Sequence, residues 1–479
     1  MEQVDVAVIG AGLLGCFVAR ELSRWKLDIL LLEAREDVCT GISRANTAVV
    51  YPGYDHKPGT LKAEMTGRAN AAFGNLCEEL DVPFDRCGSL MLSYGERADA
   101  VLRKKYQQGL ENQVPDLRLL TAAEAYRLEP GLAPGLHAAL WAPTAGTVNP
   151  WQLGIAACEN AQKNGVRLQL KTQLVALHKE SDRYLLSTNG GKVAARAVVN
   201  CAGLAADRIQ KLLFPCEVKI VTTAGDYLVL DRVSSGKPTH ILEYEPEEKK
   251  KGLTFVPTTE GSVLIGPSER ENRDDYASNR ESLLDIRNLA GRILPDLDLE
   301  RVIRSFAAAR PNPQYHDGRS VHSFVIDHPE HCFWSLIGIK TPGLTCAREL
   351  GVYIAQRLTK ELEAEINPDF EPVRSGIRKA AGRSFEQRAK LVEENPDYGE
   401  IVCVCEDVSR AEVLEAVRRG AITVDGVKRR VGTGMGRCQG TRCQRQIEAI
   451  LSRELGKQER EIEKDGPGSR IVRDVREDL

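Results

Sequence analysis

Residues 4–15 read Val-Asp-Val-Ala-Val-Ile-Gly-Ala-Gly-Leu-Leu-Gly, and this stretch decides the fold of the N-terminal part of the chain. The apolar run 4–9 predicts a short buried strand, and the residues after the last glycine predict a helix. Gly10, Gly12 and Gly15 stand between the two. The first glycine permits a tight turn, the second lets the backbone approach a pyrophosphate, and the third lets helix and strand pack closely.

An acidic residue completes this pattern. A second apolar strand, residues 29–32, ends at Glu33. Strand, helix, strand and acid together predict a dinucleotide-binding βαβ unit, in which Glu33 accepts hydrogen bonds from the adenosine ribose. A glycine-rich turn in an unrelated α/β fold is the alternative, and it does not account for the acid.

The composition limits the class of protein. The chain has 479 residues, of which 42% are hydrophobic and 28% charged, so we expect a globular protein of two or three domains. A net charge of −3 gives no reason to expect nucleic-acid binding. We find no apolar stretch long enough to span a bilayer and no secretory signal. Thirteen cysteines therefore indicate reduced thiols and metal ligands, and we expect a cytoplasmic protein, with peripheral membrane attachment through a partner left open.

The order of patterns along the chain predicts an α/β fold: a Rossmann-like domain interleaved with an α+β substrate domain, followed by a small helical domain that binds a metal cluster. We expect the first domain to comprise 1–75, 145–210 and 325–365, and the second 76–144 and 211–324. Prolines and charges over 366–398 indicate a surface linker. The cysteine-bearing domain covers 399–453, and the charged tail 454–479 indicates a frayed helix or disorder.

Four further segments carry a family resemblance. They are Thr-Gly-Ile-Ser-Arg-Ala-Asn at 40–46, Thr-Val-Asn-Pro at 147–150, Val-Val-Asn-Cys-Ala-Gly-Leu-Ala-Ala-Asp at 198–207, and Gly-Ile-Lys-Thr-Pro-Gly-Leu-Thr at 338–345. With the glycine motif, they make residues 4–360 resemble the D-amino-acid oxidase superfamily of FAD-dependent oxidoreductases. The branch that the chain most resembles contains glycerol-3-phosphate dehydrogenases and L-2-hydroxyglutarate dehydrogenases.

The resemblance implies a set of site residues. It implies non-covalent FAD held by Gly10, Gly12, Gly15, Glu33, Ser43, Arg44, Asn46, Leu174, Ala202, Gly203, Asp207, Gly338, Gly343, Leu344 and Thr345. It also implies that Arg310 binds an anionic substrate and that Lys340 approaches substrate or flavin. A surface ion-pair arginine and a solvated loop lysine are the alternatives for these two side chains.

The chain departs from the family pattern in one segment. Many relatives have a histidine where this chain has Tyr51-Pro52-Gly53, so a histidine base or a histidyl-flavin bond at that position is excluded. His240 and His316 remain as candidate bases only because they fall in the predicted substrate domain, and a structural role is the usual one for a lone histidine.

Four cysteines near the C-terminus predict a metal centre. Cys403 and Cys405 form one close pair, and Cys438 and Cys443 form another that follows a glycine-rich run. The spacing resembles the bacterioferritin-associated-ferredoxin-like [2Fe–2S] domain. Zinc also takes four thiolates, but its sites usually have two to four residues between paired cysteines, and a metal-free fold is the third alternative.

These patterns predict an FAD-dependent dehydrogenase that oxidises a small anionic hydroxy compound, of the glycerol-3-phosphate dehydrogenase type. Hydride would pass to FAD, and electrons would then pass through the [2Fe–2S] cluster to an electron-accepting protein, either a second flavoprotein subunit or a quinone-linked protein. The alternatives are a dehydrogenase of L-2-hydroxyglutarate, another 2-hydroxy acid or an imino acid, and a non-catalytic electron-transfer subunit.

Overall fold

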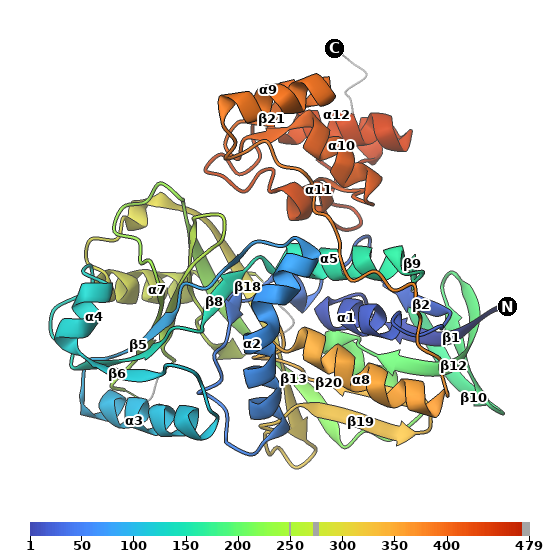
Figure 1. Cartoon of the computed structure of the whole chain (residues 1–479), viewed down its shortest axis with the longest axis horizontal. Coiled ribbons are helices and arrows are strands. Elements are labelled where there is room, and N and C mark those ends of the chain that lie inside the picture. Colours follow the sequence, from blue (N-terminus) through green and yellow to red (C-terminus); the bar gives the residue numbers. More distant parts are fainter. Residues whose placement is uncertain (249–250, 272–276, 472–479) are drawn as a thin grey trace.

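The computed structural model describes residues 1–248, 251–271 and 277–471 of the chain. These residues form two interleaved domains with a smaller module above them (Figure 1). We refer to them as the Rossmann-like domain, the sheet domain and the C-terminal module. The predicted fold class is confirmed, because a parallel α/β layer, a large mixed sheet and a small helical unit are all present.

The Rossmann-like domain is assembled from three separated stretches of chain. Its elements are β1 (Glu2–Ile9), α1 (Leu13–Leu22), β2 (Ile29–Leu32), η1 (Ile42–Arg44), β3 (Val49–Val50), α2 (Leu61–Leu80), β8 (Gly146–Val148), α5 (Pro150–Lys163), β9 (Arg167–Gln169), β10 (Leu174–Glu180), β11 (Arg183–Thr188), β12 (Gly191–Asn200), η2 (Gly203–Ala205), α6 (Ala206–Gln210), β19 (Val325–Glu330), β20 (Phe333–Ile337) and α8 (Ala347–Glu361). β1 lies between β12 and β2, parallel to both, and β9 extends the sheet beyond β2.

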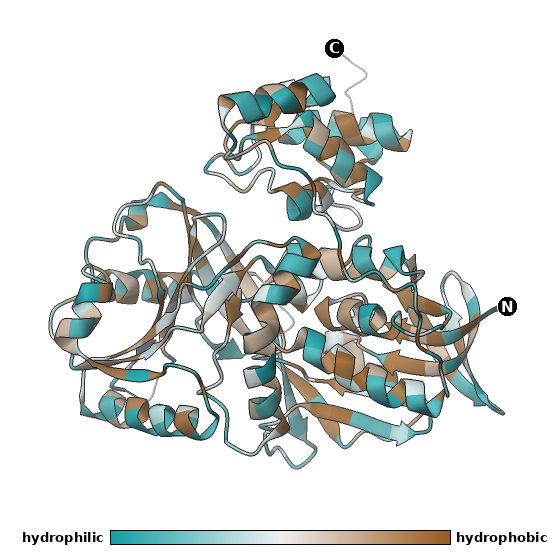
Figure 2. Cartoon of the chain, viewed as in Figure 1, coloured by the Kyte–Doolittle hydropathy of each residue, from teal (hydrophilic) through white to brown (hydrophobic). Residues whose placement is uncertain are grey.

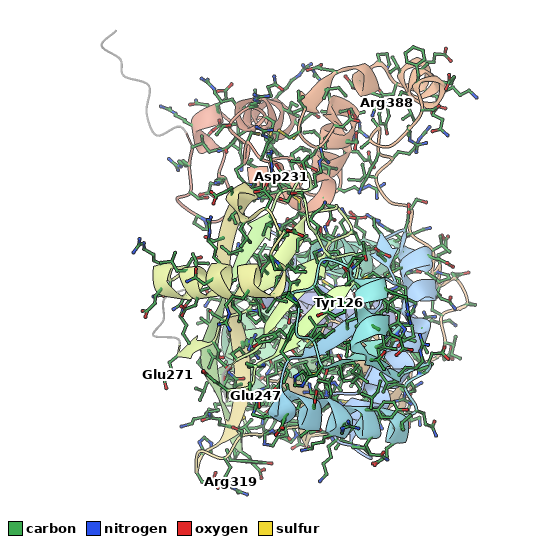
Figure 3. The ribbon with its side chains drawn as sticks, turned by 90° about the vertical axis from the view of Figure 1, so that its left-hand side faces the viewer. Tyr126, Asp231, Glu247, Glu271, Arg319 and Arg388 are labelled. Atoms are coloured by element: carbon green, nitrogen blue, oxygen red, sulfur yellow. The ribbon has the colours of Figure 1, made fainter. Side chains whose placement is uncertain are left out.

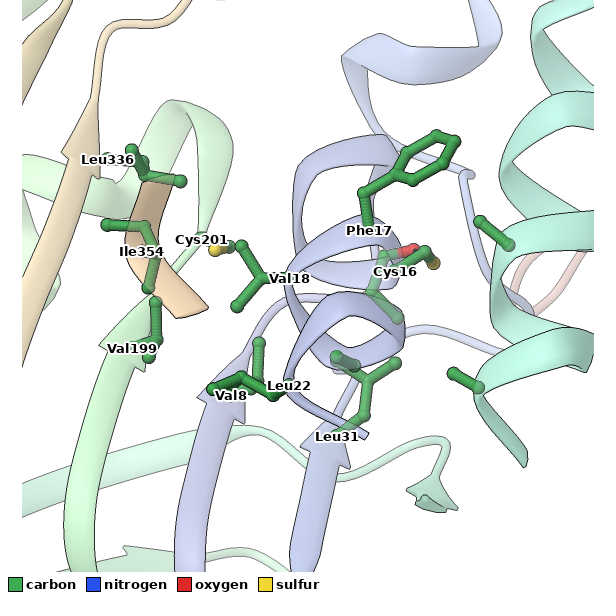
Figure 4. Packing of buried hydrophobic residues seen from close by; sticks show 14 of the residues in the cluster. Val8, Cys16, Phe17, Val18, Leu22, Leu31, Val199, Cys201, Leu336 and Ile354 are labelled. Atoms are coloured by element: carbon green, nitrogen blue, oxygen red, sulfur yellow. Dashed lines mark hydrogen bonds between the residues drawn. The ribbon is translucent and has the colours of Figure 1, made fainter. Parts of the chain in front are cut away.

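The core of this domain surrounds α1. All four residues of β2 and nine of the ten residues of α1 are buried, as expected for a sheet covered on both faces. Side chains of Val18 and Leu22 on α1 lie among those of Val8 and Val199 from the sheet (Figure 4). The helix is thereby fixed between the sheet and the helices α5 and α8, so its N-terminus has one defined position.

The sheet domain contains the longest strands. Its elements are β4 (Phe84–Asp85), β5 (Ser89–Ser93), α3 (Glu96–Glu111), β6 (Arg118–Thr121), α4 (Ala122–Leu128), β7 (Ala138–Ala142), β13 (Val218–Leu230), β14 (Ile241–Glu245), β15 (Leu253–Pro257), β16 (Val263–Gly266), β17 (Arg270–Glu271), α7 (Arg280–Ile293), η3 (Leu299–Arg301) and β18 (Val302–Tyr315). β13 and β18 pair antiparallel over nearly their full length. Hydrophobic residues are concentrated on the inner faces of the sheets and helices (Figure 2).

The C-terminal module has its own small core. Its elements are α9 (Phe385–Glu394), η4 (Pro396–Gly399), β21 (Ile401–Cys403), β22 (Val408–Ser409), α10 (Arg410–Arg418), α11 (Val424–Val431), α12 (Gln444–Leu455) and η5 (Glu459–Glu461). A capping box of Ser409 and Glu412 starts α10, and Gly432 ends α11 in a left-handed conformation.

Three predicted boundaries need correction. The boundary between residues 75 and 76 falls inside α2, whose Leu76 and Leu80 belong to the core of the Rossmann-like domain. The predicted linker contains a helix, α9, although residues 366–376 do run in extended form over that domain. The tail is not frayed up to residue 471, because Ile462 is 1% exposed within the module's core; residues 472–479 lie outside the described part. Helix α9 has a local signal, the capping box of Ser384 and Gln387. The contacts of Leu76, Leu80 and Ile462, in contrast, are long-range.

Candidate functional site

The glycine loop between β1 and α1 requires residues without side chains, because the backbone packs closely there. A Cβ atom added to Gly15 would lie 1.8 Å from the carbonyl oxygen of Gly10, and one added to Gly10 would lie 2.7 Å from the oxygen of Cys201. Gly10 also has φ +97°, which other residues rarely adopt. Gly12 precedes α1 and gives the helix no side-chain cap. A glycine at this position lets the backbone at the helix N-terminus approach a phosphate group.

Glu33 lies at the end of β2, beside this loop. Its carboxylate accepts hydrogen bonds from the backbone N–H of Ala11 at 2.9 Å and of Arg35 at 2.9 Å. Burial raises the pKa of Glu33, while these N–H donors oppose the shift. The carboxylate is held at the edge of the glycine loop, where a ribose hydroxyl of a dinucleotide would reach it.

The segment after β2 has a different role at each predicted position. Ser43 Oγ accepts a hydrogen bond from the N–H of Leu13 at 2.9 Å, so it caps α1 from a distant part of the chain. Arg44 instead forms an ion pair with Asp465 of the C-terminal module at 2.6 Å. The Asn46 side chain is held by local backbone bonds that shape the loop.

The segment after β12 lies against the glycine loop. The Cα atom of Ala202 is 3.1 Å from a Cβ position on Gly10, and Gly203 turns the chain with φ +58°. Asp207 accepts a hydrogen bond from the N–H of Ile220 at 3.2 Å, which ties α6 to β13. Leu174 is buried at the start of β10. The structure thus places the first two beside the glycine loop and gives the other two structural contacts.

The segment 338–345 connects β20 to α8. Gly338 has φ +61° and faces Pro313, and the N–H of Gly343 donates to the oxygen of Lys340 at 2.6 Å. Leu344 is partly buried against the core of the Rossmann-like domain. Thr345 Oγ1 accepts a hydrogen bond from the N–H of Tyr51 at 3.0 Å. This loop therefore joins the residues that follow β3 to the start of α8.

These features fit FAD. The glycine cradle, the start of α1 and the half-buried Glu33 carboxylate match the pyrophosphate and ribose of a dinucleotide. The flavin ring, when bound, supplies the hydride acceptor for oxidation of a C–H bond.

Arg310 and Lys340 are brought together, although one lies on β18 and the other in the loop after β20. Arg310 is opposite Thr223 on β13, contacts Glu269 at 3.7 Å and hydrogen-bonds the Tyr227 side chain. Lys340 Nζ donates to Asn312 Oδ1 at 2.7 Å. Burial lowers the pKa of Lys340, and the positive charge of Arg310 lowers it further. Two cations whose charges act on each other favour an anionic ligand between them.

Two lysines that the sequence did not indicate lie near this pair. Burial and the charge of Lys340 lower the pKa of Lys62, on α2, to about 8. Desolvation and the charge of Arg310 lower the pKa of Lys251, although that residue as a whole is exposed. Neither lysine lies in a motif, and only the tertiary fold brings them near the other two. We call Lys62, Lys251, Arg310 and Lys340 the cation cluster.

A polar network borders the cation cluster. The hydroxyl of Tyr54 donates to Glu243 Oε1 at 2.9 Å, and Lys105 pairs with Asp55. Burial and the neighbouring charge of Asp55 raise the pKa of Glu243 to about 7. Burial also raises the pKa of the Tyr51 hydroxyl above its usual value, so that hydroxyl stays protonated at neutral pH.

The two histidines proposed from the sequence, His240 and His316, are each held by a hydrogen bond within the fold. His240 Nδ1 lies 2.7 Å from Glu129, and His316 Nε2 lies 2.9 Å from the oxygen of Cys216. Both are therefore structural in this fold, and the candidate role as a base is not supported. His56 was missed: it is buried, its Nε2 has no hydrogen-bond partner among the described residues, and burial lowers its pKa to about 4.

The four cysteines converge as two pairs in the C-terminal module. Cys403 and Cys443 shift each other's pKa, as do Cys405 and Cys438, so the thiols lie near each other within each pair. The contact with Cys443 lowers the pKa of Cys403 to about 6. Backbone N–H groups of the glycine-rich loops point at the sulfurs; those of Gly440 and Arg442 lower the pKa of Cys438 against the opposing effect of burial. Such donors stabilise thiolates that bind metal.

The arrangement of the sulfurs favours two metal ions over one. A single tetrahedral zinc ion holds four sulfurs about 3.8 Å apart, given Zn–S bonds of about 2.3 Å. Among the described residues, one group of three metal-binding side chains has all its ligand atoms within 4.8 Å, and it is His331, Cys332 and Glu361 rather than these cysteines. Two separate pairs fit a cluster in which each iron takes two thiolates.

A cavity of about 500 Å³ lies between the module and the other two domains. Ala48, Leu264 and Phe306 line it from one side, and Met435 and Gln439 from the module. Asp231, another lining residue, lies where the main body meets the module (Figure 3). The cavity therefore separates the substrate-side strands from the loops that carry the cysteines.

Comparison with known proteins assigns both parts of the chain. The FAD dependent oxidoreductase family matches residues 5–357, and the BFD-like [2Fe-2S] binding domain matches residues 401–453. The chain is 38% identical over 477 residues to a glycerol 3-phosphate dehydrogenase of Caloramator mitchellensis, covering 98% of both proteins. It is 26% identical to a glycerol 3-phosphate oxidase of Mycoplasma pneumoniae, covering 75% of this chain and 97% of the oxidase.

Among solved structures, an L-alpha-glycerophosphate oxidase from Mycoplasma pneumoniae with FAD bound is similar in fold. Its TM-score is 0.72 at 24% identity, covering 78% of this chain and 99% of the oxidase. The similarity therefore extends over almost the whole oxidase, and part of this chain has no counterpart in it. Within the described residues, no helix is both long and apolar enough to cross a membrane.

Proposed function

The chain belongs to the FAD dependent oxidoreductase family, and from that premise we propose that it oxidises glycerol 3-phosphate and delivers the electrons through its [2Fe–2S] module to a partner protein. The enzyme class and the two cofactors follow from the family matches. The substrate and the partner are the proposal.

The cation cluster carries the proposal for the substrate. Arg310 and Lys340 come from different elements, and the charge of Arg310 lowers the pKa of Lys340. The charge of Lys340 likewise lowers the pKa of Lys62, and the charge of Arg310 lowers that of Lys251. Several converging cations are more than a monocarboxylate requires, whereas a phosphate monoester presents about two negative charges and three acceptor oxygens at neutral pH. The Caloramator relative, matched over its whole length, supports glycerol 3-phosphate as the phosphate ester.

The residues around the site give this chain its own tasks in the reaction. Arg310 and Lys340 would hold the phosphate, so that the reacting carbon faces the flavin. The Tyr51 hydroxyl stays protonated and can therefore donate a hydrogen bond but not remove a proton. His56 has a ring nitrogen without a hydrogen-bond partner among the described residues, but its pKa of about 4 makes it a weak proton acceptor at neutral pH.

The C-terminal module carries the proposal for the partner. An enzyme that passes both electrons directly to oxygen has no use for a one-electron centre. A protein acceptor, either a second flavoprotein subunit or a quinone-linked protein, would take electrons singly from the cluster.

A substrate panel tests this function. Purified protein with both cofactors is supplied with glycerol 3-phosphate, L-2-hydroxyglutarate, proline or glycerol, and turnover is followed with an artificial one-electron acceptor. We expect turnover with glycerol 3-phosphate at a kcat/KM at least about 100-fold above that of glycerol, because the phosphate supplies the charge-assisted contacts. Preferred turnover of L-2-hydroxyglutarate or proline would overturn the substrate assignment.

A further inference from the structure

A buried ion cluster joins the C-terminal module to the Rossmann-like domain. Asp37, in the loop after β2, accepts hydrogen bonds from Arg430 at 2.8 and 2.9 Å and from Arg429 at 3.0 Å. Exposed side-chain fractions are 2% for Asp37 and 5% for each arginine. Burial alone would raise the pKa of Asp37, but the two arginines outweigh it and hold the pKa below its usual value.

A second acid extends this cluster toward the flavin-binding loop. Asp465, from the segment that follows η5, accepts a hydrogen bond from Arg429 at 2.8 Å and another from Arg44 at 2.6 Å. Two carboxylates therefore balance the two buried arginines, and the chain of contacts runs from α11 to η1.

The loop that carries Asp37 also shapes the dinucleotide cradle. Its first residue is Glu33, and Ser43, near its end, caps α1. Between them, the N–H of Cys39 donates to the carbonyl of Ala11 in the glycine loop at 2.8 Å. The module is thus attached to the segment that is expected to hold the FAD pyrophosphate.

The other contacts of the module with the rest of the chain are less deeply buried. The hydrophobic core of the module is separate from that of the Rossmann-like domain, so the two share no continuous apolar core. Arg232 reaches the carbonyl of Cys405 and the carboxylate of Glu406, and Arg304 contacts Gln439 at 3.4 Å, but both arginines are exposed. Exposed polar contacts contribute little to docking.

A further ion pair, Arg419 at the end of α10 with Glu159 of α5 at 3.2 Å, is partly buried, with side chains 24% and 15% exposed. The Asp37 cluster is the most deeply buried of these described polar contacts between the module and the Rossmann-like domain.

We propose that Asp37, Arg429 and Arg430 form a docking latch that holds the [2Fe–2S] module at a fixed distance from the flavin, so that electrons pass between the two cofactors within one chain. These are positioning residues, since none of them is among the residues assigned to the substrate or cofactor sites. The proposal rests on the electron route of the proposed function and does not depend on which substrate is oxidised.

The test uses Asp37→Asn in the full chain with both cofactors, and Glu365→Gln as control. Glu365 forms an exposed pair with Lys26, so its loss should have no effect. The flavin is reduced by light with an external donor, which needs no substrate, and cluster reduction is followed by rapid-freeze EPR. Hydrogen exchange of residues 424–431 reports docking independently of electron flow.

We expect Asp37→Asn to slow cluster reduction by at least about tenfold, because it leaves two buried arginines short of a partner, while light reduction of the flavin is unchanged. Exchange at 424–431 should rise in the same variant. Asp465→Asn removes only the contacts of Asp465 with Arg429 and Arg44, so it is a milder variant for the case that Asp37→Asn does not fold. We expect it to slow cluster reduction about twofold to threefold.

Two results would overturn the latch: a folded Asp37→Asn protein with wild-type cluster reduction and exchange, or an Asp465→Asn protein indistinguishable from the Glu365→Gln control. Failure of the substrate proposal is separately visible, since light-driven transfer would then be normal while glycerol 3-phosphate left the flavin oxidised.

Discussion

The Rossmann-like domain and the C-terminal module hold their cofactors in opposite ways. The first builds its site from backbone, with glycines and a helix end fixed inside a large apolar core. The second has a core of few residues, and four thiols supply the site, two at or just after the end of β21 and two in the glycine-rich segment before α12. A large core makes the flavin site independent of its ligand, whereas a small metal-binding domain draws part of its folding free energy from the metal.

Removing a cluster ligand should give the largest difference between the cofactor contents of the two domains. In Cys438→Ser we expect loss of nearly all cluster iron, because one iron then lacks a thiolate, while FAD content and substrate reduction of the flavin persist. Iron analysis and EPR measure the first, and visible spectra the second. Cys87→Ser, at a half-buried cysteine outside both sites, is the matched control. Simultaneous loss of FAD from Cys438→Ser would show that the two sites fold as one unit.

A change in the glycine cradle should have the converse effect. In Gly15→Val the added Cβ atom would meet the Gly10 carbonyl at 1.8 Å, so helix and strand must separate. We expect FAD affinity to fall by at least about 100-fold while the module keeps its iron. Flavin release on gel filtration measures the loss. Gly74→Ala, in α2 with no atom within 4 Å of the added Cβ, should retain FAD, and retention by Gly15→Val would contradict the assigned cradle.

A substitution of Arg310 tests the predicted substrate site, from which electrons would enter the flavin and then the cluster. Arg310→Met removes one cation from the predicted substrate site and should lower kcat/KM for glycerol 3-phosphate by about 100-fold to 1,000-fold, with FAD and iron content unchanged. Steady-state kinetics with an artificial acceptor measure this. Arg319→Met, at an exposed arginine on the loop after β18, is the control. Equal kinetics for the two variants would move the substrate away from the cation cluster.

The lysines of the cation cluster predict a pH dependence. The pKa of Lys62 is lowered to about 8, so its ammonium group loses charge as the pH rises through that value. The KM for glycerol 3-phosphate should therefore rise about threefold to tenfold between pH 7 and pH 9. Lys62→Arg keeps its charge over this range and should flatten the profile. A profile unchanged by that substitution would exclude Lys62 as the titrating group.

Elements that neighbouring residues determine can be predicted from the sequence, whereas features that depend on long-range contacts cannot. The strand, glycine loop and helix at 4–22 follow from neighbouring residues, and the structure confirms these elements. Lys62 and Lys251 gain a role only because distant strands bring them toward Arg310. The Asp37 latch joins positions about 390 residues apart, and the ordered segment up to residue 471 depends on the burial of Ile462. No local pattern encodes such contacts.

One measurement tests the central claim most directly. Oxidised protein is mixed anaerobically with glycerol 3-phosphate and no acceptor, and visible absorption and rapid-freeze EPR are recorded over time. The account predicts that flavin absorbance falls first and that a reduced [2Fe–2S] signal follows in the same molecules at a rate independent of protein concentration. A flavin that stays oxidised, or a reduced flavin beside a cluster that never gains an electron, would contradict it.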